Sequence, residues 1–141
     1  MPARFVDASV FVHAYLKPRR ELRPRESQIK RHARAIVTRI NEGEPVVTST
    51  VHFAEIANLL EDWMVLSEAQ EVLLGLATID NVRILSVTRN DLLDALALAT
   101  SEPVGTTDAL AVVLMGREGA RDIYSFDRDY DRFDGIRRLA Q

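Results

Sequence analysis

The chain has 141 residues, with 18 Lys and Arg, 21 Asp and Glu, no Cys and a formal net charge of −3. This length predicts one domain over residues 1–141, burying roughly 70% of the surface that its unfolded chain exposes. The lack of Cys excludes disulfides and thiolate-bound zinc. The mixed charges exclude a disordered acidic or basic tail, and their slightly acidic total does not by itself favour nucleic acid.

No apolar run approaches the roughly 18 residues of a membrane-spanning helix. The apolar stretch from Phe5 to Leu16 is interrupted by Asp7 and His13, and no small-residue cleavage site follows it. It therefore does not have the pattern of a signal peptide. We expect a soluble, cytoplasmic protein with no membrane partner.

Short apolar runs alternate with helical patterns along the chain. The runs predict strands at residues 4–6, 45–48, 82–87, 122–125 and 136–139. Apolar residues at helical spacing predict helices at residues 9–15, 26–43, 53–63, 67–76, 88–99 and 106–116. Helix caps are expected at Ser9, at Thr106 or Thr107, and in the capping boxes Ser67-x-x-Gln70 and Thr88-x-x-Asp91, with helix ends at Gly43 and Gly116. Strands separated by helices predict an α/β fold of three layers around a short central parallel sheet.

Four acids are expected at the carboxyl edge of this sheet, where α/β proteins form their sites: Asp7, Glu55, Asp108 and Asp127. Their neighbours are mostly apolar or small, and no Lys or Arg adjoins the first three. A carboxylate in such surroundings must be paired, protonated or bound to a cation, so the group predicts a divalent-cation site. Oxygen ligands without Cys favour Mg²⁺ or Mn²⁺.

Each acid also has an ordinary structural interpretation. Asp108 would suit a helix start through the helix dipole alone, and Glu55 would suit an exposed helix position. Asp7 is harder to explain, since an acid ending an apolar strand has a structural use only as a cap of the next helix. His52 and Glu55 are three residues apart on one helix face, a spacing that suits a transition metal, but no further ligands accompany them.

Four sequence blocks, in order, resemble those of PIN-domain nucleases. They are Phe5-Val6-Asp7-Ala8-Ser9-Val10, Ser49 with Glu55, Thr106-Thr107-Asp108-Ala109-Leu110-Ala111, and Tyr124-Ser125-Phe126-Asp127-Arg128-Asp129-Tyr130. The resemblance spans the chain, whose length suits a single-domain member such as the VapC toxins of VapBC toxin–antitoxin pairs. It implies a Mg²⁺- or Mn²⁺-dependent endoribonuclease whose catalytic and metal-binding acids are Asp7, Glu55, Asp108 and Asp127.

The acids are expected to play different roles. Asp7 and Asp108 would bind the principal ion, and Asp127 would complete the shell of a second ion or hold its waters. Glu55 would orient or deprotonate the attacking water. The hydroxyl groups of Ser9 and Thr107 would hydrogen-bond the carboxylates, or would only cap helices.

The fourth acid is placed by alignment at Asp127, through Ser125, where the family usually has Thr. Asp129 is the alternative at this position. Asp131 and Asp134 are expected on the solvated surface.

Charge is unevenly distributed along the chain. The segment from Lys17 to Arg39 holds nine basic residues and two acids, a balance of +7, while the remaining residues carry −10. This basic segment would contact an RNA backbone, or is a solvated loop and helix face. Apolar residues at Phe53, Trp63, Met64 and Leu66 indicate a homodimer or a partner groove, although core burial explains them equally well. The resemblance also implies a cognate antitoxin.

Two other functions stay open. One is a PIN-like RNA-binding or RNA-processing module outside a toxin–antitoxin pair, with weak or no nuclease activity. The presence of all four acids argues against this alternative. The other is a metal-dependent phosphatase of another α/β fold. Such phosphatases commonly need Asp-x-Asp after the first strand, and Asp7-Ala8-Ser9 lacks the second acid.

Overall fold

The computed structural model describes residues 2–141 and contains each predicted strand and helix. The strands are β1 Arg4–Val6, β2 Val46–Ser49, β3 Val82–Leu85, β4 Asp122–Tyr124 and β5 Arg137–Leu139. The helices are α1 Ala8–Tyr15, α2 Pro24–Asn41, α3 Thr50–Trp63, α4 Leu66–Thr78, α5 Arg89–Ser101 and α6 Thr106–Glu118. A short 3₁₀ helix, η1 Arg128–Arg132, was not predicted.

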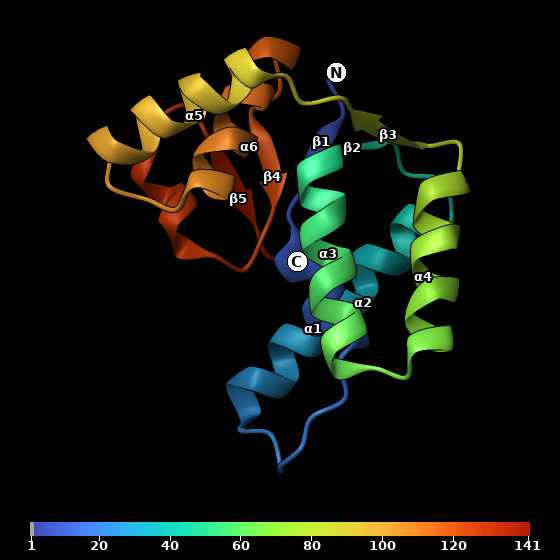
Figure 1. The fold of residues 1–141 in the computed structure, drawn as a ribbon. Coiled ribbons are helices and arrows are strands. Elements are labelled where there is room, and N and C mark those ends of the chain that lie inside the picture. Colours follow the sequence, from blue (N-terminus) through green and yellow to red (C-terminus); the bar gives the residue numbers. More distant parts are fainter. Residues whose placement is uncertain (1) are drawn as a thin grey trace.

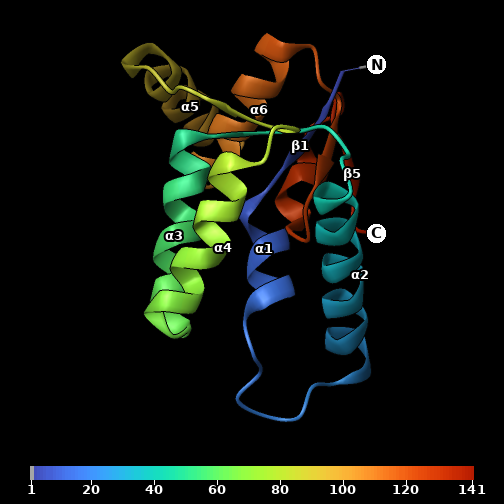
Figure 2. The same cartoon turned by 90° about the vertical axis from the view of Figure 1, so that its right-hand side faces the viewer.

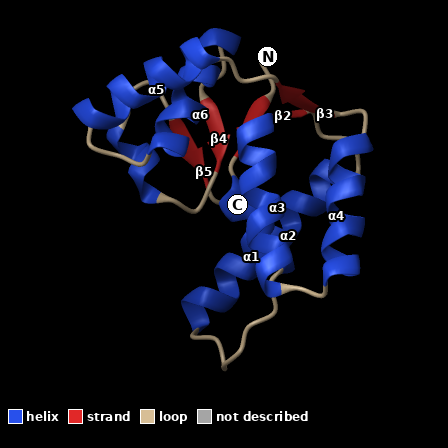
Figure 3. Ribbon diagram, viewed as in Figure 1, coloured by secondary structure: helices blue, strands red, loops and turns tan. Residues whose placement is uncertain are grey.

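The five strands form one parallel sheet in the order β3-β2-β1-β4-β5 (Figure 1). Their side chains alternate between two cores, with Phe5, Val47 and Ile123 on one face and Val6, Val46 and Tyr124 on the other. Helices α1 to α4 cover one face and α5 and α6 cover the other (Figure 2). Figure 3 shows the strands between these two sets of helices. The predicted three-layer α/β fold is therefore confirmed.

Three predicted helix caps are wrong. The N-caps of α1, α4 and α6 are Asp7, Val65 and Gly105, one or two residues before the predicted Ser and Thr caps. Ser9 lies inside the first turn of α1 because its hydroxyl is used elsewhere, by Asp7 and by the backbone N–H of Phe126. The capping box of α5 is confirmed, since Thr88 and Asp91 exchange side-chain-to-backbone hydrogen bonds of 2.9 and 3.2 Å.

Two helix ends also differ from the prediction. α2 begins two residues earlier than predicted, at Pro24, where a missing N–H costs nothing. α6 continues through Gly116 and ends at Glu118, followed by Gly119, whose φ of +69° suits the left-handed C-cap. None of the helices in residues 2–141 combines the length and apolar character needed to cross a membrane.

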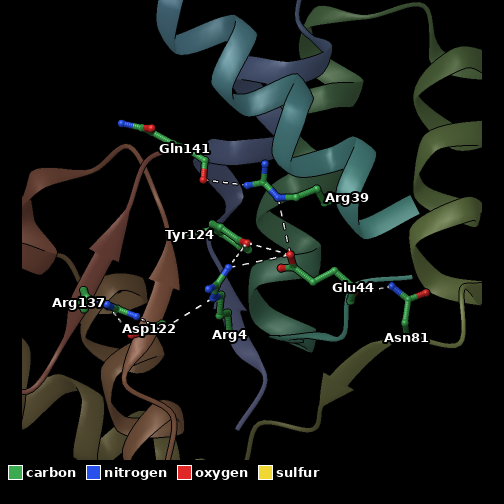
Figure 4. A network of polar contacts seen from close by, with 8 residues as sticks. All are labelled: Arg4, Arg39, Glu44, Asn81, Asp122, Tyr124, Arg137 and Gln141. Atoms are coloured by element: carbon green, nitrogen blue, oxygen red, sulfur yellow. Dashed lines mark hydrogen bonds and ion pairs between the residues drawn. The ribbon is translucent and has the colours of Figure 1, made fainter. Parts of the chain in front are cut away.

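A polar network fixes the amino-terminal edge of the sheet (Figure 4). Glu44, just before β2, accepts a hydrogen bond of 3.0 Å from Tyr124 Oη, and its carboxylate lies 3.7 Å from Arg39 Nε on α2. Asp122, the first residue of β4, is bound by both Nε and Nη2 of Arg137, which starts β5, at 3.0 and 2.7 Å. Arg4 at the start of β1 joins both groups. The opposite edge is left for the acidic residues.

Candidate metal and catalytic site

The four predicted acids meet at the carboxyl edge of the sheet. Asp7 follows β1, Asp127 lies three residues after β4, Glu55 lies in the second turn of α3, and Asp108 lies in the first turn of α6. All four line one pocket of about 260 Å³, together with Ser9 and other residues of α1 and α3. The structure thus brings together residues more than 100 positions apart in the sequence. Their roles as ligands remain a prediction.

Asp7 is held by three hydroxyl groups. Its Oδ2 accepts hydrogen bonds of 2.8 Å from Ser9 Oγ and 2.8 Å from Ser125 Oγ. Its Oδ1 lies 3.3 Å from Tyr130 Oη. Asp7 is only 5% exposed, so these hydrogen bonds replace bonds to water and fix the direction of the carboxylate. Of the three donors, the sequence predicted only Ser9.

Tyr130 is a site residue that the sequence reasoning missed. It lies in η1 with no exposed surface, and its Oη is 3.2 Å from Asp108 Oδ1 as well as near Asp7. Burial and the charges of Asp7 and Asp108 raise its pKa, so the hydroxyl stays protonated. A single hydroxyl therefore lies between the two acids predicted to bind the principal ion. The only signal in the sequence was a phenol within an acidic block.

The electrostatics of the pocket favour a cation. Burial and the charges of Asp127 and Asp7 raise the pKa of Asp108 to about 7. Burial and the charge of Asp7 also raise the pKa of Glu55, whose Oε2 accepts a hydrogen bond of 3.2 Å from Thr107 Oγ1. No Lys or Arg is among the described residues that line the pocket. A divalent cation fits such a donor set, because carboxylate oxygens are the ligands that Mg²⁺ and Mn²⁺ prefer.

The two candidates for the fourth acid lie close together. Asp108, Asp127 and Asp129 each place a carboxylate oxygen within 4.8 Å of the other two. Asp127 caps η1 by accepting the N–H of Asp129 at 2.9 Å, and it lines the pocket with Asp7, as Asp129 does not. This arrangement favours Asp127. The surface positions expected for Asp131 and Asp134 are found, and Asp131 pairs with Arg138 at 3.0 Å.

His52 has a structural role instead of a metal-binding one. The imidazole is fully buried, with Nδ1 2.6 Å from Ser49 Oγ and Nε2 2.9 Å from the carbonyl oxygen of Thr107. Both ring nitrogens are engaged, so the transition-metal interpretation of His52 with Glu55 is wrong. Burial lowers the pKa of His52, which keeps the ring neutral. The residue ties the start of α3 to the start of α6, the helices that carry Glu55 and Asp108.

The fold and the pocket define an α/β protein with a carboxylate-rich pocket at the carboxyl edge of its sheet. The sequence model of the PIN domain matches residues 4–136, and the chain belongs to this family. A search among curated proteins found no match.

Three solved structures share the fold. The VapC20 toxin of Mycobacterium tuberculosis, described as cleaving the sarcin-ricin loop, is 19% identical, with a TM-score of 0.70 over 92% of this chain and 93% of that one. PAE2754 of Pyrobaculum aerophilum is 14% identical, with a TM-score of 0.60 over 97% and 89%. A chain of VapBC2 from Rickettsia felis, bound to promoter DNA, is 12% identical, with a TM-score of 0.64 over 97% of both chains. At these identities the similarity is one of fold.

Proposed function

We propose that this PIN-domain protein is a Mg²⁺- or Mn²⁺-dependent endoribonuclease and the toxin of a type II toxin–antitoxin pair. The observation that carries the proposal is the pocket in which Asp7, Glu55, Asp108 and Asp127 converge without a basic side chain among its described lining residues. The fold shared with VapC20, a toxin that cleaves the sarcin-ricin loop, and with VapBC2 supports it.

The chain's own residues suit hydrolysis of a phosphodiester. A bound divalent cation supplies a coordinated water of lowered pKa and neutralises the charge that develops on the leaving oxygen. Asp7 and Asp108 would hold the principal ion, and Asp127 would complete the shell of a second ion or hold its waters. Glu55 would orient or deprotonate the attacking water.

The direct test is cleavage of a fluorophore-labelled single-stranded RNA by the purified protein with Mg²⁺, with Mn²⁺ and with EDTA. We expect internal cleavage that requires the cation. Cleavage unaffected by EDTA would contradict the proposed metal dependence. Cation-independent RNA binding without cleavage would favour the alternative, an RNA-binding or RNA-processing module.

We further propose a homodimer and a cognate antitoxin as protein partners. Apolar side chains that remain exposed are Trp63 and Leu66 at the α3–α4 corner, at 54% and 55%, and Leu92, Leu93 and Leu96 on α5. Phe53 and Met64 instead pack against the core, so core burial explains these two. The VapBC2 structure, whose fold is shared, supports an antitoxin partner.

Replacing Tyr130 with Phe is expected to weaken Mn²⁺ binding by roughly 10- to 100-fold, the usual cost of removing a group that orients metal ligands. The change removes only the oxygen that lies between Asp7 and Asp108. Titration calorimetry with Mn²⁺ measures the effect, and Tyr15→Phe, at the end of α1 away from the acids, serves as the matched control. Equal affinities of the wild-type and Tyr130→Phe proteins would show that the hydroxyl does not position the ligands.

The basic segment is partly committed to internal contacts. Arg20 forms two hydrogen bonds with Glu26, and Arg19 lies 4.4 Å over the Trp63 ring. We expect the double variant Arg19→Glu/Arg23→Glu to bind RNA more weakly. The slope of the logarithm of the binding constant against the logarithm of the salt concentration should become shallower by about 0.7 for each phosphate that the variant no longer neutralises. Fluorescence anisotropy at several salt concentrations measures both. Arg121→Glu, an exposed change before β4 at the other edge of the sheet, should have a smaller effect. A salt dependence that is the same in all three proteins would identify the segment as an ordinary solvated surface.

A further inference from the structure

A second pocket lies under the connection between α1 and α2, the loop that extends from the helical layer in Figure 1. Its volume is about 240 Å³. Its apolar walls come from both helices and the loop, and they are Val12, Leu16, Pro18, Leu22 and Ile29. Ligand pockets for drug-sized molecules usually measure roughly 300–1,000 Å³, so this one suits a single ring system.

Internal contacts join the walls of the pocket. Lys30 Nζ on α2 donates hydrogen bonds to the carbonyl oxygens of Leu16 and His13, the latter at 3.0 Å, which joins the two helices. The carboxylate of Glu26 is bound by both terminal nitrogens of Arg20, at 3.0 and 2.7 Å. Glu26, the acid among the residues that line the pocket, is therefore neutralised by Arg20, so its charge does not require a cationic ligand.

The pocket adjoins the acidic site. Val12 and His13 line both pockets, and His13 lies six residues, or about 9 Å of helix rise, beyond Asp7. The ring of His13 packs edge-on against Phe126, the residue before Asp127, with centroids 5.4 Å apart. An RNA strand whose cleaved phosphodiester lies at the acids would thus bring a neighbouring base to this pocket.

The charge at the mouth suits a nucleic-acid backbone. Lys17 lines the pocket and is exposed, and it forms no ion pair with any of the residues that the structure describes. Arg19, two residues further along the loop, is also exposed. Proteins that bind single-stranded RNA combine cationic grooves with surfaces that receive unstacked bases, and here those surfaces are the aliphatic walls and the His13 ring.

We propose that this pocket binds the base of one nucleotide flanking the cleaved phosphodiester, with Lys17 contacting the adjoining phosphate. The inference rests on the proposed ribonuclease function. The inference predicts that the RNA is single-stranded at this nucleotide, because a base within a duplex is stacked and cannot enter the pocket.

The test combines a base deletion in the RNA with a change in the pocket. After the cleaved position of a labelled RNA is mapped, each flanking nucleotide in turn is made abasic, and KM and kcat are measured. For the wild-type protein we expect one abasic position to raise KM by roughly 5- to 150-fold, the usual effect of removing one bound base. Leu22→Glu should have a raised KM for the intact RNA and no further penalty for the abasic one. Ile29→Phe, which fills the pocket, should behave in the same way, and Leu74→Glu, at an exposed site on α4, should behave as wild type.

The outcomes separate this inference from the proposed function. If the wild-type protein cleaves RNA and the abasic penalty is the same in Leu22→Glu and Ile29→Phe, the base pocket alone is overturned. A protein partner is then the remaining candidate to occupy it. A wild-type protein that cleaves no RNA overturns the proposed function. Anisotropy of RNAs made abasic at each position in turn then tests the pocket, which is supported only if an abasic penalty in binding disappears in both pocket variants.

Discussion

We expect Asp7→Asn to abolish cation-dependent RNA cleavage while leaving the fold intact. The amide has nearly the shape of the carboxylate, and its oxygen still accepts the hydrogen bonds that Ser9 and Ser125 donate to Asp7. It lacks the negative charge that makes a carboxylate a strong ligand of a divalent cation. The loss should exceed the roughly 10- to 100-fold that removal of a group beside a metal ligand costs.

Cleavage rates with saturating Mg²⁺ or Mn²⁺ measure this effect, and circular dichroism checks the fold. The matched control is Asp134→Asn, the same change of charge at an exposed position. Full activity in Asp7→Asn would contradict the assignment of this residue, and an equal loss in Asp134→Asn would show that the effect is one of overall charge.

The second large effect concerns stability in the absence of metal. The pKa of Asp108 is raised from 3.8 to about 7, chiefly by burial and then by the charges of Asp127 and Asp7. A carboxyl whose pKa is higher in the folded protein contributes stability at pH values below its unfolded pKa. That contribution is lost as the pH rises through the folded pKa. The free energy of unfolding should therefore fall between about pH 4 and pH 8.

Asp108→Asn should remove much of this fall. Since one unit of pKa shift corresponds to about 1.4 kcal/mol, we expect the variant to be more stable than wild type at pH 8 by on the order of 1–3 kcal/mol. Urea unfolding in EDTA between pH 5 and pH 8 measures the difference. Parallel profiles for the two proteins would contradict the raised pKa. Added Mn²⁺ should restore stability to the wild-type protein only, because the cation requires the ionised carboxylate.

The fold was predictable because its determinants are local. Strands such as Val46–Ser49 are short apolar runs, and the face of α2 is set by the spacing of Ile36, Val37 and Ile40. A parallel sheet then places every strand end at one edge, so the convergence of Asp7 and Asp127 follows from topology. Helix starts were less predictable, because Ser9 and Thr107 are used as donors to carboxylates instead of as caps.

The groups that hold the acids from distant parts of the sequence were not predictable from local patterns. Tyr130 and Ser125 contact Asp7 across more than 100 residues of sequence. His52 meets the carbonyl of Thr107 across 55 residues. Such contacts depend on how α6 and the turn after β4 pack against the sheet, and the sequence carries no periodic signal for them. The sequence predicted the acids and two of their supporting hydroxyls, those of Ser9 and Thr107, whereas Ser125 and Tyr130 were found by the structure alone.

The most direct test of the central claim is Mn²⁺ titration calorimetry on the metal-free protein and on single Asp-to-Asn and Glu-to-Gln variants. We predict binding of one or two ions by the wild type, and much weaker binding by the variants at Asp7, Asp108 and Asp127. Asp131→Asn, a change of the same charge at a surface ion pair with Arg138, should bind as wild type does. No binding by the wild-type protein, or unchanged binding after removal of the Asp7 and Asp108 carboxylates, would contradict a cation site at the carboxyl edge of the sheet.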